Sequence, residues 1–510
     1  MAQKDVPLSD TQLRARIRGC WIGKAVGGTL GQPWEGHRRP LNLTFYQPVP
    51  TEMIPNDDLD LQVVWAAVLD RMDTPRVDRH ALAQAWLDHV QFPWDEYGVA
   101  LRNLRNGLKA PQTGSFDNWF TQGMGAAIRS EIWACLAAGD PKLAAAYAYE
   151  DACVDHADEG IHAEVFFAAI ESAAFIEHNR DRLIDIGLAA IPETSLTYRA
   201  VIDTRQWWAQ QPNWLAVRER ILDRYGSDNF TDSVMNIGFI ILGWLAGDGD
   251  FGESICIANN CGMDTDCTAA TLGAILGIID PDSIDARWTD PIGDKLVLNK
   301  GIVGIDHPDT LDGFTDLILD LRHRLDGRPP APEDLTQSTE HLAIPVRMGF
   351  VPSLDDTETR LPPAGAPEPT LPPSAVSTTL PGTYARLLAH EFEDEVLLLR
   401  YTLTLEEPRD VRIMFNCPQA NRVWIDGVYR FGRDHGPMVP APHRAPADQF
   451  VNLSLGAGVH TLTAAVRRPS NGRGVQWVVG VVDQKTYQWL PDVLFQKKAE
   501  PALSPIASKR

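Results

Sequence analysis

Apolar side chains recur with helical spacing through the first two-thirds of the chain. One stripe falls at positions i, i+3, i+4, i+7 and i+8 of a single segment: Leu61, Val64, Trp65, Val68 and Leu69. This spacing puts the five side chains on one face of an amphipathic helix. Alanine-rich segments at 81–90, 126–138, 143–152 and 160–177 repeat the pattern, and alanine favours helices that pack closely. We therefore predict an all-α domain over about residues 13–324.

The spacing of apolar residues changes toward a period of two in the last quarter of the chain. Short segments rich in β-branched and aromatic residues lie at 396–405, 411–416, 422–425, 450–455, 460–466 and 475–482. Turn-forming sequences such as Asp426-Gly427 separate them. Regularly spaced short strands are typical of an antiparallel sandwich or jelly roll. The predicted fold is therefore multi-domain, with an all-α domain followed by a jelly-roll-like β-sandwich.

A proline-rich segment lies between the two patterns, at residues 351–382. We predict an extended linker here, because proline removes backbone donors and the segment offers few apolar side chains to bury. An ordered strap docked on the surface of a domain is the alternative. The predicted domains are a helical catalytic domain at 1–350, the linker at 351–382, the sandwich at 383–495 and a tail at 496–510.

The charge and the cysteines narrow the classes of function. The chain of 510 residues carries a formal net charge of −22, which argues against nucleic acid as a partner, since nucleic-acid binders concentrate Lys and Arg. Its apolar runs are too short to cross a bilayer, and the polar segment Met1–Pro7 does not resemble a secretory signal. The seven cysteines show no CxxC pairs or framework spacing, which favours reduced thiols and a cytoplasmic location.

Three acidic residues cluster just ahead of the helix predicted around 61–69. The motif reads Asn56-Asp57-Asp58-Leu59-Asp60. A single acid at a helix start is explained by capping and by the helix dipole. Three acids in five residues exceed what capping requires, and adjacent carboxylates repel one another unless a cation neutralises them. The motif is therefore a candidate metal site, with helix capping as the alternative.

A second pair of acids precedes an apolar helix of small residues far along the chain. It lies in Gly262-Met263-Asp264-Thr265-Asp266-Cys267, directly before the helix predicted at 268–277. Carboxylates directed into a protein core cost free energy unless they are paired or bind a metal. Two such motifs would form a site of oxygen ligands, which suits Mg²⁺, Mn²⁺ or Ca²⁺ rather than zinc.

An ordered set of motifs resembles the ADP-ribosylglycohydrolase family over about residues 13–345. The glycine-rich stretch 18–31 is similar to the family's first helix, and Gln32-Pro33-Trp34-Glu35-Gly36 to its acidic loop. Asn56-Asp57-Asp58 is similar to the Thr-Asp-Asp motif, and Asp264-Thr265-Asp266-Cys267 to the Asp-x-Asp-Thr motif. Residues 123–129 resemble the Gly-x-Gly-Ala-x-x-Arg helix start, and 236–277 follows the family in order and spacing.

The resemblance implies an all-α fold with a two-Mg²⁺ centre that holds a ribose-like sugar and releases a group from its anomeric carbon. The metal ligands that it implies are Asn56, Asp57, Asp58, Asp264, Asp266 and Cys267, and the catalytic residues are Asp57 and Glu35, the latter as general base. Asn56 and Cys267 stand where the family has Thr, and Gly27–Gly31 lacks the acid of the family's Gly-Asp-Ala-Leu-Gly. We therefore expect one or two Mg²⁺ ions, with Mn²⁺ or Ca²⁺ as alternatives.

Four further residues are candidates for substrate binding. The resemblance implies that Gly123, Gly125 and His156 lie at the substrate pocket, and Trp119 could stack on a base or sugar face. A histidine that caps a helix end and an aromatic residue that packs in the core are the alternatives for His156 and Trp119.

The sequence thus predicts a divalent-metal-dependent glycohydrolase that cleaves an N- or O-ribosyl-like bond. Its substrate is expected to be a sugar-bearing small molecule or an ADP-ribosyl conjugate, without a nucleic-acid or membrane partner. In the sandwich, segments 422–427 and 456–462 resemble galactose-binding-like jelly rolls, with a purely structural role as the alternative. For the whole chain, the alternative is a non-catalytic relative that acts as a binding or structural protein.

Overall fold

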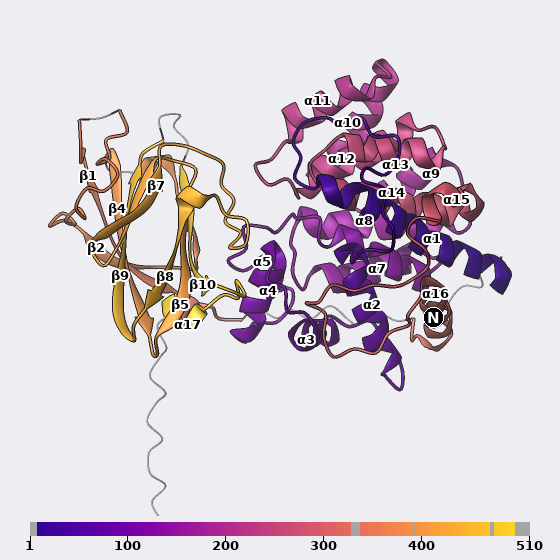
Figure 1. The fold of residues 1–510 in the computed structure, drawn as a ribbon, viewed down its shortest axis with the longest axis horizontal. Helices are drawn as coiled ribbons and strands as arrows, with labels where there is room; N and C mark the ends of the chain where they lie inside the picture. The colour runs from indigo at the N-terminus through magenta and orange to yellow at the C-terminus, as the bar shows by residue number, and fades with distance from the viewer. Residues whose placement is uncertain (1–7, 328–336, 357, 392–393, 470–473, 495–510) are drawn as a thin grey trace, which may run out of the picture. The chain divides into compact units, whose positions relative to one another are not determined.

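The computed structural model describes residues 8–327, 337–356, 358–391, 394–469 and 474–494. The chain divides into a helical unit, Met1–Phe92 with Asn103–Leu335, and a β unit, Pro93–Arg102 with Thr336–Arg510 (Figure 1). This confirms the predicted succession of a helical domain and a β domain. The segments 1–7 and 496–510 lie outside the described residues. None of the helices that the structure describes has both the length and the apolar character needed to cross a membrane.

The helical unit contains helices of 4 to 22 residues, joined by both short turns and longer loops. Its helices are α1 (Asp10–Gly31), α2 (Asp57–Asp70), α3 (Arg79–His89), α5 (Gln112–Ser115), α6 (Ser130–Leu136), α7 (Pro141–Ala152), α8 (Glu159–Ala174), α9 (Arg180–Ala189), α10 (Leu196–Gln210), α11 (Trp214–Tyr225), α12 (Ser233–Ala246), α13 (Phe251–Asn260), α14 (Thr265–Ile279), α15 (Ala286–Thr289) and α16 (Leu311–Arg324). The helix predicted at 126–138 is interrupted, because a 3₁₀ turn, η2 (Ala127–Arg129), precedes α6.

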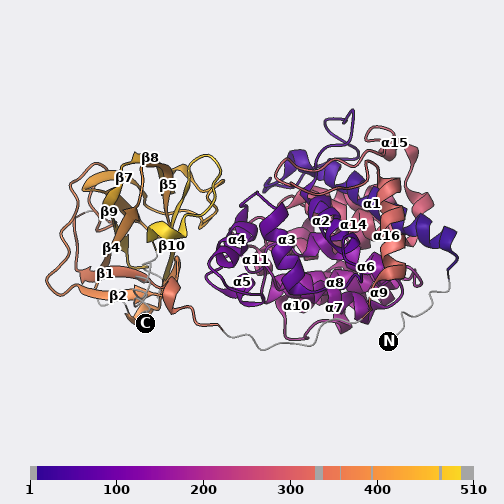
Figure 2. The ribbon, with the colours of Figure 1, turned by 90° about the horizontal axis from the view of Figure 1, so that it is seen from below.

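Helices α1 and α14 pack against each other near the centre of the helical unit (Figure 2). Glycines at every fourth position of α1 form the contact surface: Gly19, Gly23, Gly27 and Gly31. A Cβ atom added at Gly23 would lie 2.0 Å from the Gly273 carbonyl oxygen, and one at Gly31 would lie 2.3 Å from the Asp266 amide nitrogen. Only glycine allows this approach, which brings the first turn of α14 against the last turn of α1.

The β unit contains two antiparallel sheets and most of α4 (Asp95–Arg105). Its strands are β1 (Ile344–Val351), β2 (Val376–Leu380), β3 (Tyr384–Leu387), β4 (Val396–Leu405), β5 (Arg409–Asn416), β6 (Asn421–Ile425), β7 (Val428–Arg433), β8 (Phe450–Leu455), β9 (Gly458–Arg467) and β10 (Val475–Asp483), followed by the short helix α17 (Pro491–Leu494). One sheet has the order β2-β1-β4-β9-β6-β7 and the other β3-β10-β5-β8. Alternate side chains of both sheets share one apolar core that includes Leu399, Val423 and Trp477.

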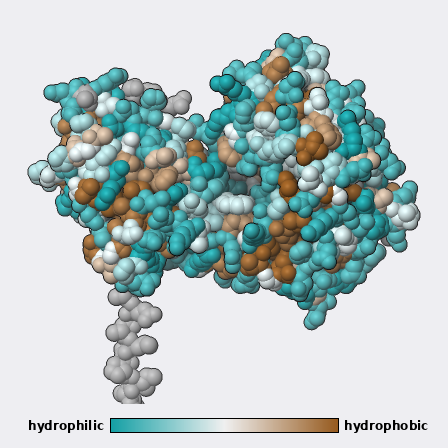
Figure 3. All heavy atoms as spheres, viewed as in Figure 1, coloured by the Kyte–Doolittle hydropathy of each residue, from teal (hydrophilic) through white to brown (hydrophobic). Residues whose placement is uncertain are grey.

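The larger sheet begins earlier in the chain than the predicted domain boundary at residue 350. Strand β1 pairs with β4, and β2, which lies inside the predicted linker, pairs with β1. In the same segment Leu361 and Leu371 are buried against Trp424, and the Trp424 indole donates to the Ala366 carbonyl at 2.8 Å. Together with the pairing of β2, these contacts place the proline-rich segment on the β unit, as in the alternative of a docked strap. On the face drawn in Figure 3, hydrophilic residues predominate and hydrophobic ones form patches.

Candidate metal centre

The first acidic motif lies at the start of α2. Asn56 is the N-cap residue, and its side-chain oxygen accepts a hydrogen bond from the Asp58 amide at 2.8 Å. Asp58 is fully buried and Asp57 is half-buried. Asp60 accepts hydrogen bonds from the backbone amide and the side chain of Asn299, at 3.0 and 2.8 Å. Asp60 therefore holds the loop that contains Asn299. Since Asn56 already caps the helix, neither Asp57 nor Asp58 is needed for capping.

The second acidic motif lies at the start of α14. Asp264 occupies the N-cap position, but its side chain accepts no capping hydrogen bond. Its backbone amide donates to the side-chain oxygen of Asn236 on α12 at 3.3 Å. Asp264, Asp266 and Cys267 are all buried, with exposed fractions of 2%, 4% and 7%. The two carboxylates thus enter the core without the usual helix-capping role.

The loop that carries Glu35 is tied to the second motif by the backbone. The Gly36 amide donates to the Met263 carbonyl, and the Met263 amide donates to the His37 carbonyl, each at 2.8 Å. Gly262 has a positive φ of 75°, and a Cβ atom there would lie 2.4 Å from the His37 carbonyl oxygen. The glycine therefore permits the close approach that places the exposed Glu35 beside Asp264 and Asp266.

The acids of three separate segments converge in what we call the carboxylate cluster: Glu35, Asp57, Asp58, Asp264 and Asp266. One ligand atom each from Glu35, Asp264 and Asp266 lie within 4.8 Å of one another, and so do atoms from Asp58, Asp266 and Cys267. Among the described residues, Asp58 Oδ2, Asp264 Oδ2 and Asp266 Oδ1 are buried and accept no hydrogen bond. Buried oxygen atoms without donors fit a cation, because a carboxylate in the core needs a compensating charge.

The pKa values of these acids reflect their crowding. Burial raises the pKa of Asp264 and of Asp266 well above the ordinary value, and the nearby Glu35 carboxylate raises it further. Burial also raises the pKa of Asp57, reinforced by the charge of Asp58. For Asp58 burial again raises the pKa, but the Lys24 ammonium opposes the rise. The protein alone therefore disfavours full ionisation of the cluster, and a bound divalent cation would favour it.

A buried lysine, which we did not single out in the sequence, contacts the cluster from α1. The Lys24 ammonium lies 3.2 Å from Asp58 Oδ1 and 2.7 Å from Glu131 Oε1, and all three side chains are fully buried. Gln62 donates to the other Glu131 oxygen at 2.9 Å and accepts from the Ile132 amide at 2.8 Å. Lys24 thus fixes one oxygen of Asp58, while the other accepts no hydrogen bond from the part of the chain that the structure describes. The signal available in the sequence was one charged residue in the glycine-rich apolar stretch that follows Gly19.

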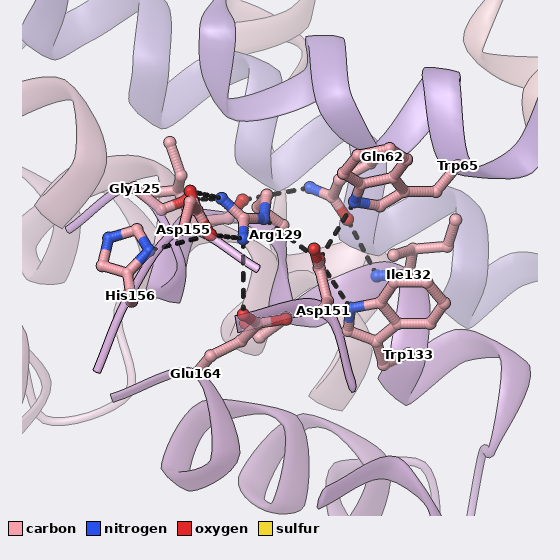
Figure 4. Close-up of polar contacts among 12 residues, drawn as sticks. Gln62, Trp65, Gly125, Arg129, Ile132, Trp133, Asp151, Asp155, His156 and Glu164 are labelled. Carbon is pink, nitrogen blue, oxygen red and sulfur yellow. Dashed lines mark hydrogen bonds and ion pairs between the residues drawn. The ribbon is translucent and has the colours of Figure 1, made fainter. Parts of the chain in front are cut away.

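His156 lies in a second buried group, the arginine cluster, which consists of Arg129, Asp151, Asp155, His156 and Glu164 (Figure 4). The Arg129 guanidinium donates to both oxygens of Asp155, at 2.9 and 2.7 Å, and to Asp151 at 3.0 Å. The His156 ring lies 3.0 Å from Asp155. Although burial opposes ionisation, Arg129 and His156 lower the pKa of Asp155 to about 2. This histidine is therefore part of a buried ionic network and is fully enclosed.

The other predicted substrate residues lie in the loop before α6. Trp119 is half-buried and packs edge-on against Phe120, with ring centroids 4.9 Å apart. Gly123 forms a β-bridge with Asp232, next to the start of α12. The Gly125 carbonyl accepts a hydrogen bond from Arg129 at 2.7 Å. Their part in binding a substrate stays a prediction.

Comparisons with known proteins agree with these motifs. The sequence model of the ADP-ribosylglycohydrolase family matches residues 9–325. Among solved structures, the chain is similar to one described as an ADP-ribosylglycohydrolase-related protein complex, at 18% identity and a TM-score of 0.43, covering 62% of this chain and 99% of that chain. A β-glucosidase from Kluyveromyces marxianus in complex with glucose is matched at 13% identity and a TM-score of 0.19, covering 28% of this chain and 15% of that chain. No curated protein matches the chain.

The assignment rests on the family model, since the structural likenesses are too low to carry it. The matched residues make up more than half of the chain and contain the glycine-rich helix α1 and both acidic motifs. The chain therefore belongs to the ADP-ribosylglycohydrolase family, whose name indicates hydrolysis of a glycosyl bond.

Proposed function

We propose that this protein is a divalent-metal-dependent glycohydrolase that cleaves the bond between the anomeric carbon of a ribose-like sugar and its leaving group. The observation that supports this most directly is the convergence of five carboxylates, three of which, those of Asp58, Asp264 and Asp266, have a buried oxygen atom that accepts no hydrogen bond from the described residues. A structural protein would gain nothing from this crowding, because each of the three buried carboxylates costs free energy if it stays ionised.

The ligands proposed for the metal are carboxylates from both helix starts. Asp57 and Asp58 lie at the first turn of α2, and Asp264 and Asp266 lie at the start of α14. Oxygen ligands of this kind suit one or two Mg²⁺, Mn²⁺ or Ca²⁺ ions. A bound divalent ion would coordinate vicinal sugar hydroxyls and would lower the pKa of a bound water molecule.

Glu35 is the proposed general base. It is exposed, and one of its oxygens lies within 4.8 Å of ligand atoms of Asp264 and Asp266. It would take a proton from water as the water oxygen bonds to the anomeric carbon and the bond to the leaving group breaks. Positioned general-base catalysis contributes about 10²–10⁴-fold to the rate. Glu35→Gln should lose turnover by about that factor while metal binding, measured by calorimetry, is retained; unchanged turnover would remove Glu35 from the mechanism.

The substrate is proposed to be a sugar-bearing small molecule or an ADP-ribosyl conjugate. The test is a screen of the purified protein with Mg²⁺ or Mn²⁺ against nucleosides, ADP-ribosyl substrates and aryl glycosides, with Asp266→Asn as the blank. Release of a leaving group that requires both the metal and Asp266 supports the proposal. Metal binding without turnover of any of these classes would favour a non-catalytic relative, and the absence of metal binding would refute the proposed centre.

A further inference from the structure

Cys267 brings a thiol into the carboxylate cluster. It is the third residue of α14, and its side chain is buried. Its sulfur lies with oxygen atoms of Asp58 and Asp266 in a group whose members are all within 4.8 Å of one another. The sulfur therefore faces acids from both helix starts.

The two carboxylates of this group have oxygen atoms available to a metal ion. Asp58 Oδ2 and Asp266 Oδ1 are buried and accept no hydrogen bond from the residues that the structure describes. The side chains are 0% and 4% exposed. One metal–sulfur and one metal–oxygen bond together span about 4.4 Å, so small side-chain movements bring the three atoms around one ion.

The chemistry of sulfur separates the possible ions. Mg²⁺ and Ca²⁺ take oxygen ligands, whereas thiolate ligands favour softer divalent ions. The other described cysteines lie outside this group, for example Cys261, which packs in an apolar cluster with Met235 and Phe239. Cys267 is thus the thiol that can change which ion the cluster selects.

We propose that Cys267 Sγ is a ligand of the metal centre, together with Asp58 and Asp266, and that it directs the centre toward a softer divalent transition-metal ion such as Co²⁺ or Zn²⁺ over Mg²⁺. The proposal rests on the proposed function, because it requires the same cluster to bind a cation. On binding, the S–H bond breaks, a sulfur–metal bond forms, and the proton passes to solvent. The metal keeps its oxidation state, so no oxidant or reductant is needed.

Cobalt reports directly on sulfur ligation. The full-length protein, freed of metal with a chelator and kept under reducing conditions, is titrated with Co²⁺ while its near-ultraviolet spectrum is recorded. A thiolate bound to Co²⁺ gives a sulfur-to-metal charge-transfer band that oxygen ligands do not give. We expect this band to saturate at the stoichiometry of Co²⁺ binding measured by calorimetry. Cys267→Ser and Cys267→Thr should bind Co²⁺ without the band, and Cys256→Ser, a buried cysteine on α13, should keep it.

The preference among ions provides the second measurement. Changes that only touch a ligand's neighbours cost 10–100-fold in metal affinity, so loss of the thiolate should narrow the preference for Co²⁺ over Mg²⁺ by about tenfold or more. Co²⁺ binding to the wild-type protein without the band, or an unchanged preference in Cys267→Thr, would overturn the assignment of Cys267 and leave the proposed metal centre standing. Failure of every divalent ion to bind the wild-type protein would overturn both. The wild-type spectrum decides the question even if a variant does not fold.

Discussion

Replacing Asp266 with asparagine should stabilise the metal-free protein and abolish its response to metal. Most substitutions of a buried, tightly packed residue destabilise a protein. At Asp266 the opposite is expected, because the side chain is 4% exposed and is crowded by the carboxylates of Glu35 and Asp264. Asparagine keeps the shape of aspartate and removes the charge.

The magnitude follows from the distances within the carboxylate cluster. Two unit charges separated by the 4.8 Å limit of the group repel by about 3–4 kcal/mol at an effective dielectric constant of about 20. Burial raises the pKa of Asp264 and of Asp266, so bound protons relieve part of this repulsion. We therefore expect Asp266→Asn to raise the free energy of unfolding of the metal-free protein by about 1–3 kcal/mol.

Thermal unfolding with and without metal is the assay. At a metal concentration of about 100 times the dissociation constant, binding adds about 3 kcal/mol to the wild-type stability, which is a rise in Tm of several degrees. In a chelator, Asp266→Asn should melt above the wild-type protein, and added Mg²⁺ or Mn²⁺ should not change its Tm. The matched control is Asp151→Asn, a buried acid of the arginine cluster that accepts hydrogen bonds from the Trp65 and Trp133 indoles. This control should melt lower than the wild-type protein and still respond to metal.

Two results would refute this reasoning. If Asp266→Asn lowers the Tm in chelator as Asp151→Asn does, the cluster is not destabilised by its charge. If it keeps the wild-type increase in Tm with metal, Asp266 is not needed for the metal centre.

Three further predictions concern the surroundings of the cluster. Lys24→Met should destabilise the protein by about 3–5 kcal/mol, because it leaves Glu131 without its buried cation. In urea unfolding, the double variant that also carries Glu131→Gln should recover much of this lost stability. Glu159→Gln should lower the free energy of unfolding by about 2 kcal/mol at pH 7, because hydrogen bonds outweigh burial and hold the pKa of Glu159 at about 2. This stabilisation is present above the unfolded pKa near 4.5 and is lost as the pH falls toward 2. The unfolding midpoints of the variant and the wild-type protein should therefore converge in acid. Gly23→Ala should lower the Tm measured by circular dichroism by more than a surface substitution does, since the new methyl group would overlap the Gly273 carbonyl.

The sequence predicted the types of elements well because their patterns are local. The alternation of apolar residues located β4 at 396–405, with the bounds that the structure has, and the helical stripe located α2. Four strands were not predicted, β1, β2, β3 and β7, and all except β1 lie at the edge of a sheet. Strand β2 is exposed along most of its length, so it lacks an alternating apolar pattern. Strand β2 is defined by its pairing with β1 rather than by a local pattern. Strand β7 is different, because it follows its partner β6 directly through the Asp426-Gly427 turn.

The candidate site was predictable as a set of acids but not as an arrangement. Glu35 was identified only through the resemblance to a family, because no other acid lies next to it in the sequence. The ion pair from Lys24 to Asp58 joins residues 34 positions apart, and nothing in the sequence around either residue indicates that the two pair with each other. The structure shows both side chains fully buried, which turns a common residue pair into a constraint on the geometry of the cluster.

Helix α1 contributes no ligand of its own to the proposed centre, yet it positions every segment that does. Its C-terminal end leads directly through η1 (Gln32–Trp34) to Glu35. Lys24 holds Asp58, and Gly28 leaves room for the Asn56 side chain, whose nitrogen would lie 1.7 Å from an added Cβ. Gly31 admits the first turn of α14. Since all three acidic segments contact or adjoin one helix, their separation is set largely by how each of them meets that helix. The glycine-rich helix is therefore as necessary to the arrangement as the carboxylates, which explains why both occur together in the matched region.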